Sequence, residues 1–415
     1  MINLYQHQKE GRDALLSHKR YCLFFGLGTG KTITALSALQ QLPPSKVLIA
    51  APKKVIEGVW KLENRIDVSQ HDITMINYEK IARDKNFAKE RFDVVILDEV
   101  HRLKGKTSNT SKILRVINKN AIYVWGLTGT PVANNYTDLY YIYNNMQIKE
   151  FDEPFNDFLW RYYVTRSLSI HTKFGYDTNI RLPVYPKEET LSELMSRIGK
   201  HCMVKRTEDC VELPDIRTNI VYVNGMRTKQ YDEFAKGIIR TKDYEDTMTP
   251  LEALNKLHQA ANGFFYDING KVNIICENRK LKELKDLLED VLEETERVII
   301  VYYYKQDLAE LQTLNYTHTT DPSDFENKQI LFLQYGQSEG LNLQYCNQII
   351  FYTYDYSYLN FEQMCGRIYR NGQKRNVTYT ILISKGTIEE KIWHAIENKE
   401  SKDKYLKGVL TDGRV

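Results

Sequence analysis

The sequence has no membrane-length apolar segment and no secretory signal. None of its apolar runs approaches the ~18 residues that a membrane-spanning helix requires. Its N-terminus is polar and then amphipathic, without the basic start, apolar stretch and small-residue cleavage site of a signal peptide. We therefore expect no membrane segment, and residence in the cytoplasm, which would be the host cytoplasm for a viral protein.

Clustered cysteines, repeats and low-complexity linkers are also missing. The six cysteines lie far apart, with no C-x-x-C pair and no group of histidines beside them, which excludes the usual zinc sites and a disulfide framework. A net charge of +3 is too small to indicate a partner, because positive charge can be confined to one groove. The 415 residues suffice for two or three directly packed domains.

Two sets of short apolar runs are present, each rich in β-branched or aromatic residues and followed by turn residues. They occupy residues 21–25, 46–52, 93–99 and 121–129, and then 298–304, 329–335, 348–354 and 378–384. This pattern is typical of parallel strands buried on both faces, and it predicts an α/β fold with two lobes. We assign residues 1–140 to the first lobe, 141–215 to a helical insertion and 216–415 to a minimal second lobe. Helical periodicity over 231–265 and 277–295 places helices at the start of that second lobe, and further helices are expected at its C-terminal end.

A glycine-rich segment directly follows the first predicted strand and opens a predicted helix. It reads Gly26-Leu27-Gly28-Thr29-Gly30-Lys31-Thr32. Glycines allow backbone N–H groups to approach phosphates, Lys31 can neutralise the β- and γ-phosphates, and Thr32 can ligate Mg²⁺. Phe25 stands where the strict P-loop pattern has its first glycine, and an ordinary glycine-rich turn is the alternative. The segment predicts a nucleoside triphosphate site at Gly28, Thr29, Gly30, Lys31 and Thr32.

Two adjacent carboxylates end the predicted strand at 93–99. Asp98 would hold Mg²⁺, and Glu99 would polarise the attacking water. Such a pair is commonplace in solvated loops, but here it follows the phosphate loop in an α/β pattern, where strand ends meet at one edge of the sheet.

Together these segments resemble the motifs of SWI/SNF-type ATPases of helicase superfamily 2. In that family's order they are residues 4–11 (Q motif), 26–32 (phosphate loop), 47–63 (Ia), 76–79 (Ib), 98–105 (DEVH box), 127–135 (III), 204–216 (the boundary between lobes), 338–343 (V) and 361–392 (VI). The resemblance covers essentially the whole chain and implies two RecA-like lobes. The small size and an Asn-, Lys-, Ile- and Tyr-rich composition suggest a bacterial or phage member.

The resemblance also implies roles for individual residues. Gln8 would read the adenine edge, and His101 with Thr130 would couple the ATP site to motif III. Motif VI would supply Gln363, Arg367 and Arg370 as catalytic groups, and an arginine finger of this kind can contribute ~10³ to 10⁵ in rate. The alternative for the two arginines is a solvated helix face, since positions i and i+3 are neighbours on a helix.

Nucleic-acid contacts are expected on the same loop-bearing edge and in motif V. The candidates are Lys53, Lys54, Tyr78, Thr128, Ser338, Gly340 and Asn342. The segment from Trp160 to Lys173 interleaves aromatic and basic residues, which suits stacking and phosphate binding. The alternative is that these aromatics form the core of the insertion.

The sequence therefore predicts an ATP- and Mg²⁺-dependent motor that moves along duplex, forked or branched DNA. A strand-separating or branch-migrating helicase is one alternative, and an ATP-gated DNA-binding clamp without hydrolysis is another. A nuclease is a further alternative, but the sequence contains no metal-binding His/Asp cluster beyond the Mg²⁺ site already assigned. One chain holds both lobes, so a monomer suffices, and a recruiting protein cannot be named from the sequence.

Overall fold

The protein consists of two compact units. The structure, a computed structural model, describes residues 3–103, 105, 108–129, 131, 136–171, 177–210, 212–240 and 245–398. The first unit comprises the described residues before Glu212, and the second those from Glu212 onward. No helix among the described residues is long and apolar enough to cross a membrane.

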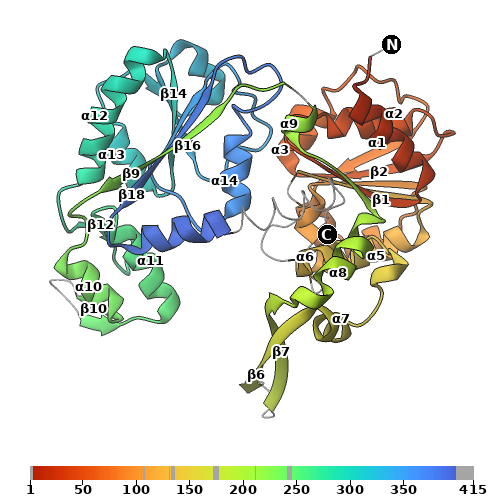
Figure 1. Cartoon of the computed structure of the whole chain (residues 1–415), viewed down its shortest axis with the longest axis horizontal. Helices are drawn as coiled ribbons and strands as arrows, with labels where there is room; N and C mark the ends of the chain where they lie inside the picture. Colours follow the sequence, from red (N-terminus) through yellow and green to blue (C-terminus); the bar gives the residue numbers. More distant parts are fainter. Residues whose placement is uncertain are drawn as a thin grey trace. The chain divides into compact units, whose positions relative to one another are not determined.

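The first unit is built on a six-stranded sheet with the order β3-β2-β4-β5-β1-β8, in which all neighbouring strands are parallel (Figure 1). Its strands are β1 (Arg20–Phe25), β2 (Lys46–Ala50), β3 (Asp72–Ile76), β4 (Val94–Asp98), β5 (Tyr123–Thr128) and β8 (Cys202–Lys205). The sequence predicted β1, β2, β4 and β5 but neither β3 nor β8.

Helices cover both faces of this sheet. They are α1 (Gln6–Ser17), α2 (Lys31–Leu39), α3 (Lys53–Val55), α4 (Tyr78–Arg83), α5 (Asn109–Asn120), α6 (Thr137–Asn145), α7 (Phe155–Tyr162), α8 (Glu188–Gly199) and α9 (Thr207–Cys210), with single turns at Ile56–Trp60, Lys85–Lys89, Val100–Leu103 and Lys149–Phe151. Apolar residues of α1 and α2 form one core cluster with the sheet, and those of α5, α6, α7 and α8 form another. The strands are therefore buried on both faces, as their apolar runs predict.

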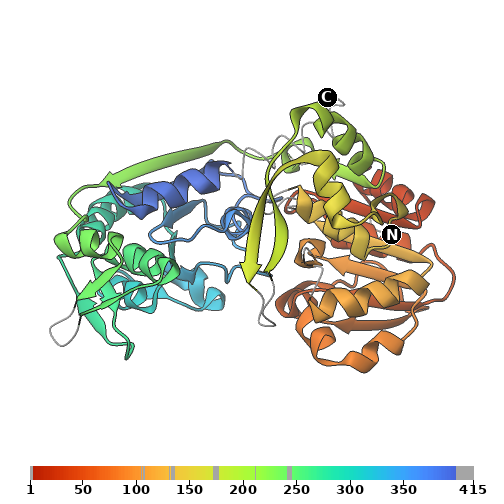
Figure 2. The same ribbon diagram turned by 90° about the horizontal axis from the view of Figure 1, so that it is seen from below.

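The predicted helical insertion at 141–215 is partly wrong, because a β-hairpin lies in its middle. Strands β6 (Tyr163–His171) and β7 (Asp177–Pro186) form a separate antiparallel pair between α7 and α8. Both views show the pair standing apart from the six-stranded sheet (Figures 1 and 2). The segment is rich in β-branched and aromatic residues and includes two prolines, Pro183 and Pro186, which favour extended backbone over helix.

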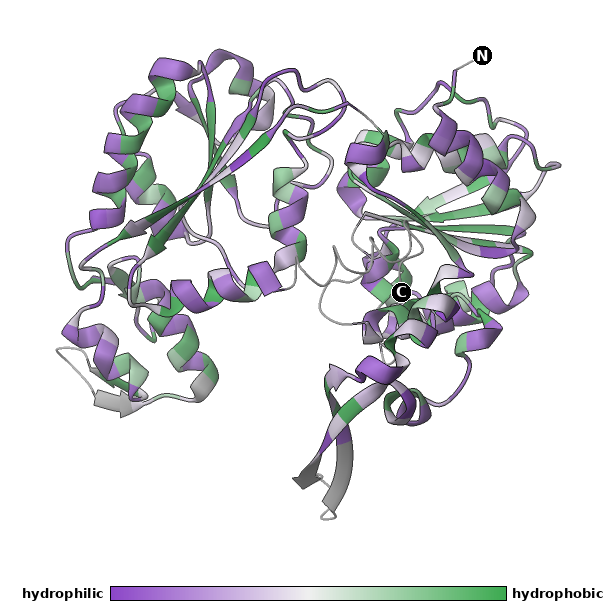
Figure 3. Cartoon of the chain, in the orientation of Figure 1, coloured by the Kyte–Doolittle hydropathy of each residue, from purple (hydrophilic) through white to green (hydrophobic). Residues whose placement is uncertain are grey.

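The second unit has a parallel six-stranded sheet of its own, with the order β15-β16-β14-β17-β18-β9. The strands are β9 (Ile216–Val223), β14 (Val298–Tyr302), β15 (His318–Thr319), β16 (Ile330–Gln334), β17 (Gln348–Phe351) and β18 (Val377–Ser384). The helices beside it are α12 (Arg279–Glu294), α13 (Lys305–Leu311), α14 (Tyr358–Cys365), a turn at Pro322–Asn327 and a helix from Ile388 onward. Figure 3 shows apolar strands and helices with one apolar side. Two α/β lobes with parallel sheets are thus confirmed.

A small layer of helices and hairpins precedes α12. It contains α10 (Lys229–Ala235), β10 (Ile238–Arg240), β11 (Glu245–Thr247), α11 (Pro250–Ala260), β12 (Phe264–Tyr266) and β13 (Val272–Ile274), with a core cluster of its own. The predicted helical stretch at 231–265 is therefore interrupted. Gly237, with φ of 76°, ends α10 and redirects the chain into β10.

Candidate nucleotide-binding and coupling site

The phosphate loop joins β1 to α2 through backbone that requires glycine. Gly28 and Gly30 have φ of 75° and 86°, in the left-handed region. A Cβ at Gly30 would lie 2.3 Å from Nε2 of Gln8, so a side chain there would displace the Gln8 amide from its hydrogen bond with Thr29. The loop ends at the N-terminus of α2, where unpaired N–H groups and the helix dipole favour an anion.

Two polar side chains of the loop donate hydrogen bonds to backbone carbonyl oxygens at its start. The ammonium of Lys31 donates to the carbonyl oxygens of Phe25 at 2.9 Å and Gly26 at 3.2 Å. The hydroxyl of Thr29 also donates to Gly26, at 2.8 Å. Thr32 lies in the first turn of α2 and is partly exposed. The predicted phosphate-binding residues are therefore adjacent at one strand end.

Two residues at the start of α1 form hydrogen bonds with the phosphate loop. Nε2 of His7 lies 2.8 Å from the carbonyl oxygen of Thr29, and Nε2 of Gln8 donates to the same oxygen at 3.1 Å. The amide oxygen of Gln8 accepts from the N–H of Tyr5 at 3.0 Å. Both ring and amide are buried. Recognition of adenine by Gln8 stays a prediction. In this structure the Gln8 amide positions the phosphate loop, and so does His7. His7 was not predicted from the sequence, although it directly precedes Gln8.

A cavity of about 510 Å³ opens beside this segment. Its lining residues come from α1, α9 and the end of β8, and they are Tyr5, Gln6, His7, Glu10, Lys205, Arg206, Asp209 and Cys210. Lys205 and Glu10 form an ion pair at 2.7 Å across it. Because His7 both lines the cavity and contacts Thr29, the cavity borders the phosphate loop.

Asp98 ends β4 as a buried carboxylate, with 5% of its surface exposed. Its Oδ2 accepts from Nε1 of Trp60 at 2.8 Å, and its Oδ1 accepts from the N–H of Glu99 at 2.9 Å. Burial, followed by the negative charge of Glu99, raises the pKa of Asp98 to about 6, while the Trp60 hydrogen bond and the charge of Lys31 oppose that rise. Asp98 thus lies within electrostatic reach of the phosphate loop.

Glu99 has an uncommon backbone conformation and bonds to two polar side chains. Its φ of 50° lies in the left-handed region, which few residues other than glycine adopt. Its Oε2 lies 3.3 Å from Nδ1 of His101 and 3.3 Å from Oγ1 of Thr128, and the last two atoms are 2.9 Å apart. The structure therefore joins the end of β4 to the end of β5 through His101, as the predicted coupling requires. Thr130, the other predicted coupling residue, lies outside the described residues.

Two residues of this edge that were predicted to contact nucleic acid have buried side chains. Tyr78 is buried and its hydroxyl donates to the carbonyl oxygen of Asp98 at 2.6 Å, while Thr128 is buried beside His101. Neither side chain offers a surface to a ligand. Lys53 and Lys54 are exposed at the start of α3, just beyond the carboxyl end of β2, and their contact with nucleic acid stays a prediction.

The second unit holds the predicted residues of motifs V and VI. Arg367 and Arg370 lie in the turns that follow α14, so a solvated helix face is wrong for them. Both guanidinium groups donate to the carbonyl oxygen of Leu341, at 3.4 and 3.2 Å. Burial lowers the pKa of Arg370. The two motifs thus share one hydrogen-bonded cluster.

The remaining predicted residues of this unit differ in exposure. Gln363 is buried within α14. Ser338 is 1% exposed, and its contact with nucleic acid stays a prediction. Gly340, with φ of 76°, is partly exposed and Asn342 is exposed. A role of these two in nucleic-acid binding stays a prediction.

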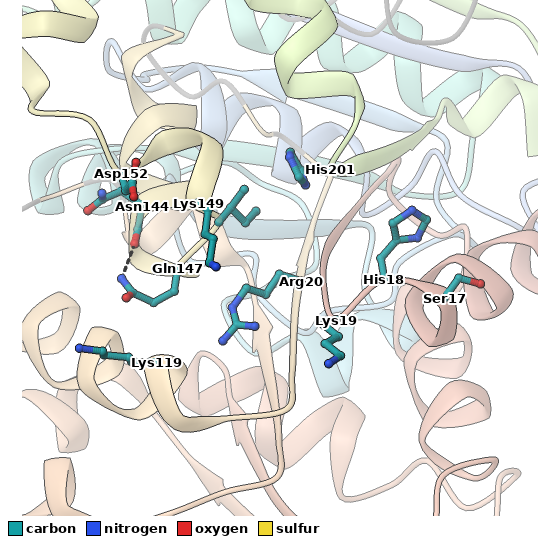
Figure 4. A pocket seen from close by; sticks show the side chains of 11 residues that line it. Ser17, His18, Lys19, Arg20, Lys119, Asn144, Gln147, Lys149, Asp152 and His201 are labelled. Atoms are coloured by element: carbon teal, nitrogen blue, oxygen red, sulfur yellow. Dashed lines mark hydrogen bonds between the residues drawn. The ribbon is translucent and has the colours of Figure 1, made fainter.

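A second cavity of the first unit, about 660 Å³, lies beside the start of β1 (Figure 4). Arg20 on its wall donates to the carbonyl oxygens of Met146, Asn118 and Ala121 at 3.0 to 3.3 Å. Cations at the carboxyl ends of helices are stabilised by the helix dipole, and these oxygens belong to the ends of α5 and α6. Because β1 begins here and the phosphate loop follows its other end, this cavity is not part of the nucleotide site.

Comparison with known proteins finds two matching families and several similar proteins. The SNF2-related domain family matches residues 61–281, more than half of the chain, and the helicase conserved C-terminal domain matches residues 252–372. The ATP-dependent helicase YqhH of Bacillus subtilis is 21% identical, over 93% of this chain and 76% of its own.

Two further matches come from other organisms. The SWI/SNF-related matrix-associated actin-dependent regulator of chromatin subfamily A-like protein 1 homolog of Caenorhabditis elegans is 22% identical, over 95% of this chain and 61% of its own. This chain thus spans about three fifths of that relative. The Sulfolobus solfataricus SWI2/SNF2 ATPase core, solved in complex with dsDNA, is 20% identical with a TM-score of 0.43, covering 99% of this chain and 94% of that chain. The family match over more than half of the sequence shows that this chain belongs to the SNF2-related family of helicase-like ATPases.

Proposed function

We propose that this protein is a DNA-stimulated ATPase that couples ATP hydrolysis to movement along duplex, forked or branched DNA. The observation that carries the proposal is the hydrogen-bonded cluster of Glu99, His101 and Thr128 beside a phosphate loop. A purely binding clamp has no need of a carboxylate that is held in a strained backbone and bonded to the next strand end. The relatives support the choice of DNA, since one is solved in complex with dsDNA and others are named helicases.

In this proposal residues of each unit have separate parts in the chemistry. Backbone N–H groups of residues 28–32 and the ammonium of Lys31 bind the phosphates, and the adenine base occupies the cavity beside His7. Glu99 orients the attacking water, and the carbonyl-bound Arg367 and Arg370 carry the positive charge that stabilises the transferring phosphoryl group.

The donor set also fits Mg²⁺. The described residues contain no group of three or more His, Cys, Asp or Glu side chains that would hold a metal by themselves. Mg²⁺ in phosphoryl-transfer sites needs only one or two protein oxygens, because substrate phosphates and waters supply the rest. Thr32 and Asp98 would hold it, and when bound it would neutralise charge on the phosphates. One chain contains every residue in this account, so we propose that the protein works as a monomer. We also propose that it works in the cytoplasm.

The test is steady-state ATP hydrolysis by the wild type and by Glu99→Gln, without nucleic acid and with single-stranded DNA, duplex DNA, a fork or RNA at fixed salt. We expect strong stimulation by duplex or forked DNA, and its loss in Glu99→Gln with ATP binding retained. Glu296→Gln, the same change at an exposed carboxylate of the second unit, is the matched control.

Other results would favour the alternatives. Equal, unstimulated rates under all conditions would refute the motor and favour an ATP-gated clamp. Displacement of a labelled strand from a simple duplex would identify a strand-separating helicase, and ATP-dependent reversal of a synthetic fork would identify a branch-migrating one. DNA-stimulated hydrolysis with neither activity would identify a duplex-tracking motor.

A further inference from the structure

The root of the β6–β7 hairpin carries an exposed aromatic and basic surface. Trp160, the sixth residue of α7, is 59% exposed, and Tyr185, near the end of β7, is 57% exposed. The guanidinium carbon of Arg181 lies 4.8 Å from the centre of the Trp160 ring. We call Trp160, Arg181 and Tyr185 the hairpin-root surface.

Packing of the first unit does not account for these exposed rings. The neighbouring residues Phe158, Leu159, Tyr162 and Tyr163 already fill the core at this point and are almost completely buried. The hydroxyl of Tyr162 accepts from Arg197 at 2.8 Å and donates to Glu193 at 2.8 Å, so the root is anchored by polar contacts as well. The interleaved aromatics of the sequence are thus divided, with the two tyrosines inside and the tryptophan outside.

The backbone fixes the position of the hairpin-root surface. The ammonium of Lys187 donates to the carbonyl oxygen of Trp160 at 2.8 Å, and the N–H of Lys187 donates to the carbonyl oxygen of Tyr162 at 2.8 Å. These bonds tie the end of β7 to α7, so Trp160 and Arg181 are held together by the fold. A cation over an aromatic ring adds about 0.5 to 1 kcal/mol at an exposed site.

The chemistry of this surface fits an unpaired base of a nucleic acid. Bases stack on aromatic rings and on guanidinium planes whatever their identity, because every base has a π-face. Bases inside a duplex are already stacked on their neighbours, so an unpaired base is the natural occupant. Residues 163–186 include three basic residues (Arg166, Lys173 and Arg181) and one acidic residue (Asp177), a net positive charge that attracts the phosphates on either side of such a base.

We infer that the hairpin-root surface stacks an unpaired base beside the duplex, so that this motor prefers DNA with a single-stranded arm over blunt duplex DNA. The inference rests on the proposed function and deepens it, because it names a junction between single- and double-stranded DNA as the substrate. It assigns a binding role to Trp160 and Arg181 that is separate from the ATP site.

The test compares the affinities for a labelled blunt duplex and for the same duplex with a single-stranded arm of about ten nucleotides, a length typical of one binding surface for unpaired strands. The readout is the ratio of the two affinities, measured by fluorescence anisotropy at fixed salt without ATP. We expect Trp160→Ala to lower that ratio about tenfold, the loss of one stacked base, with the affinity for blunt duplex unchanged. Trp160→Tyr, which keeps an aromatic plane, should retain most of the ratio.

Arg181→Gln serves as a second variant that leaves the tryptophan in place and should lower the same ratio less. Tyr222→Ala removes a similarly exposed aromatic from β9 of the second unit and is the matched control. An unchanged ratio in Trp160→Ala, or a wild type without preference for the arm, would overturn the inference. Stimulation of wild-type ATPase by blunt duplex, measured in parallel, reports on the motor itself and separates the two failures.

Discussion

A buried ion pair in the second unit gives the sharpest test of its stability. Lys280 of α12 is completely buried, and its ammonium lies 2.7 and 2.8 Å from the two carboxylate oxygens of Glu389, which is 1% exposed. Asn262 completes the cluster, accepting from Lys280 at 3.1 Å and donating to Glu389 at 3.2 Å. Glu389 also accepts from the N–H of Ser384 at 2.8 Å, so the pair links α12, β18 and the last helix.

We expect Lys280→Met to destabilise this unit by about 3 to 5 kcal/mol, because it leaves a buried carboxylate without its counter-charge. His258, 4.0 Å from Glu389, is neutral near pH 7 in the wild type, since burial, together with the charge of Lys280, lowers the pKa of His258 to about 4.

Unfolding in urea, followed by ¹⁹F NMR of 5-fluorotryptophan, can measure this loss in the intact chain. Trp393 is the one tryptophan of the second unit among the four in the sequence, and it lies in that unit's core. Lys282→Met, at an exposed position of the same helix, is the control. The reasoning is refuted if Lys280→Met costs less than about 1 kcal/mol, or if Lys280→Met combined with Glu389→Leu, which removes both charges, is no more stable than the single variant.

Three further predictions concern the ATP site. Trp60→Phe removes the hydrogen bond that opposes the raised pKa of Asp98, so the acid limb of ATPase activity should move to higher pH in a pH–rate profile; an unmoved limb would contradict this. Gly30→Ala, at a φ of 86° and against the Gln8 amide, should abolish binding of a fluorescent ATP analogue, and retained binding would show that the loop adapts. His101→Ala should retain most basal hydrolysis and lose DNA stimulation, so a parallel loss of both rates would place His101 in the chemistry rather than in coupling.

Sequence periodicity predicted the long apolar strands and missed the short or partly polar ones. β3 reads DITMI and β9 reads IRTNIVYV, and each lies at or near a sheet edge, where one side of the strand need not be apolar. The hairpin was missed for a different reason. Its aromatics continue the amphipathic pattern of α7, and only pairing between β6 and β7 reveals the change of period.

The site was predicted where motif spacing places residues at strand ends, and less well where a side chain turns inward. Lys31, Asp98 and Glu99 lie together because parallel strands end at one edge. Tyr78 is the first residue of α4 and Ser338 lies in a loop, and the direction of each side chain depends on the local backbone, which motif spacing does not determine. His7 carried no signal beyond its place before Gln8, because its contact is with a backbone carbonyl 22 residues away.

The two inward-facing residues of motifs Ia and Ib suggest how the first unit links its functions. Trp60, from the Ia segment, donates to the carboxylate of Asp98, and Tyr78, from the Ib segment, donates to the carbonyl of the same residue. These segments, with exposed Lys53 and Lys54 in Ia, were predicted to contact nucleic acid. A shift of the Ia segment on its ligand would therefore change the Trp60 hydrogen bond to Asp98, and with it the pKa of Asp98. A shift of the Ib segment would change the hydrogen bond to the Asp98 carbonyl. Direct bonding of this kind makes the buried Tyr78 a candidate for transmitting DNA binding to the ATP site.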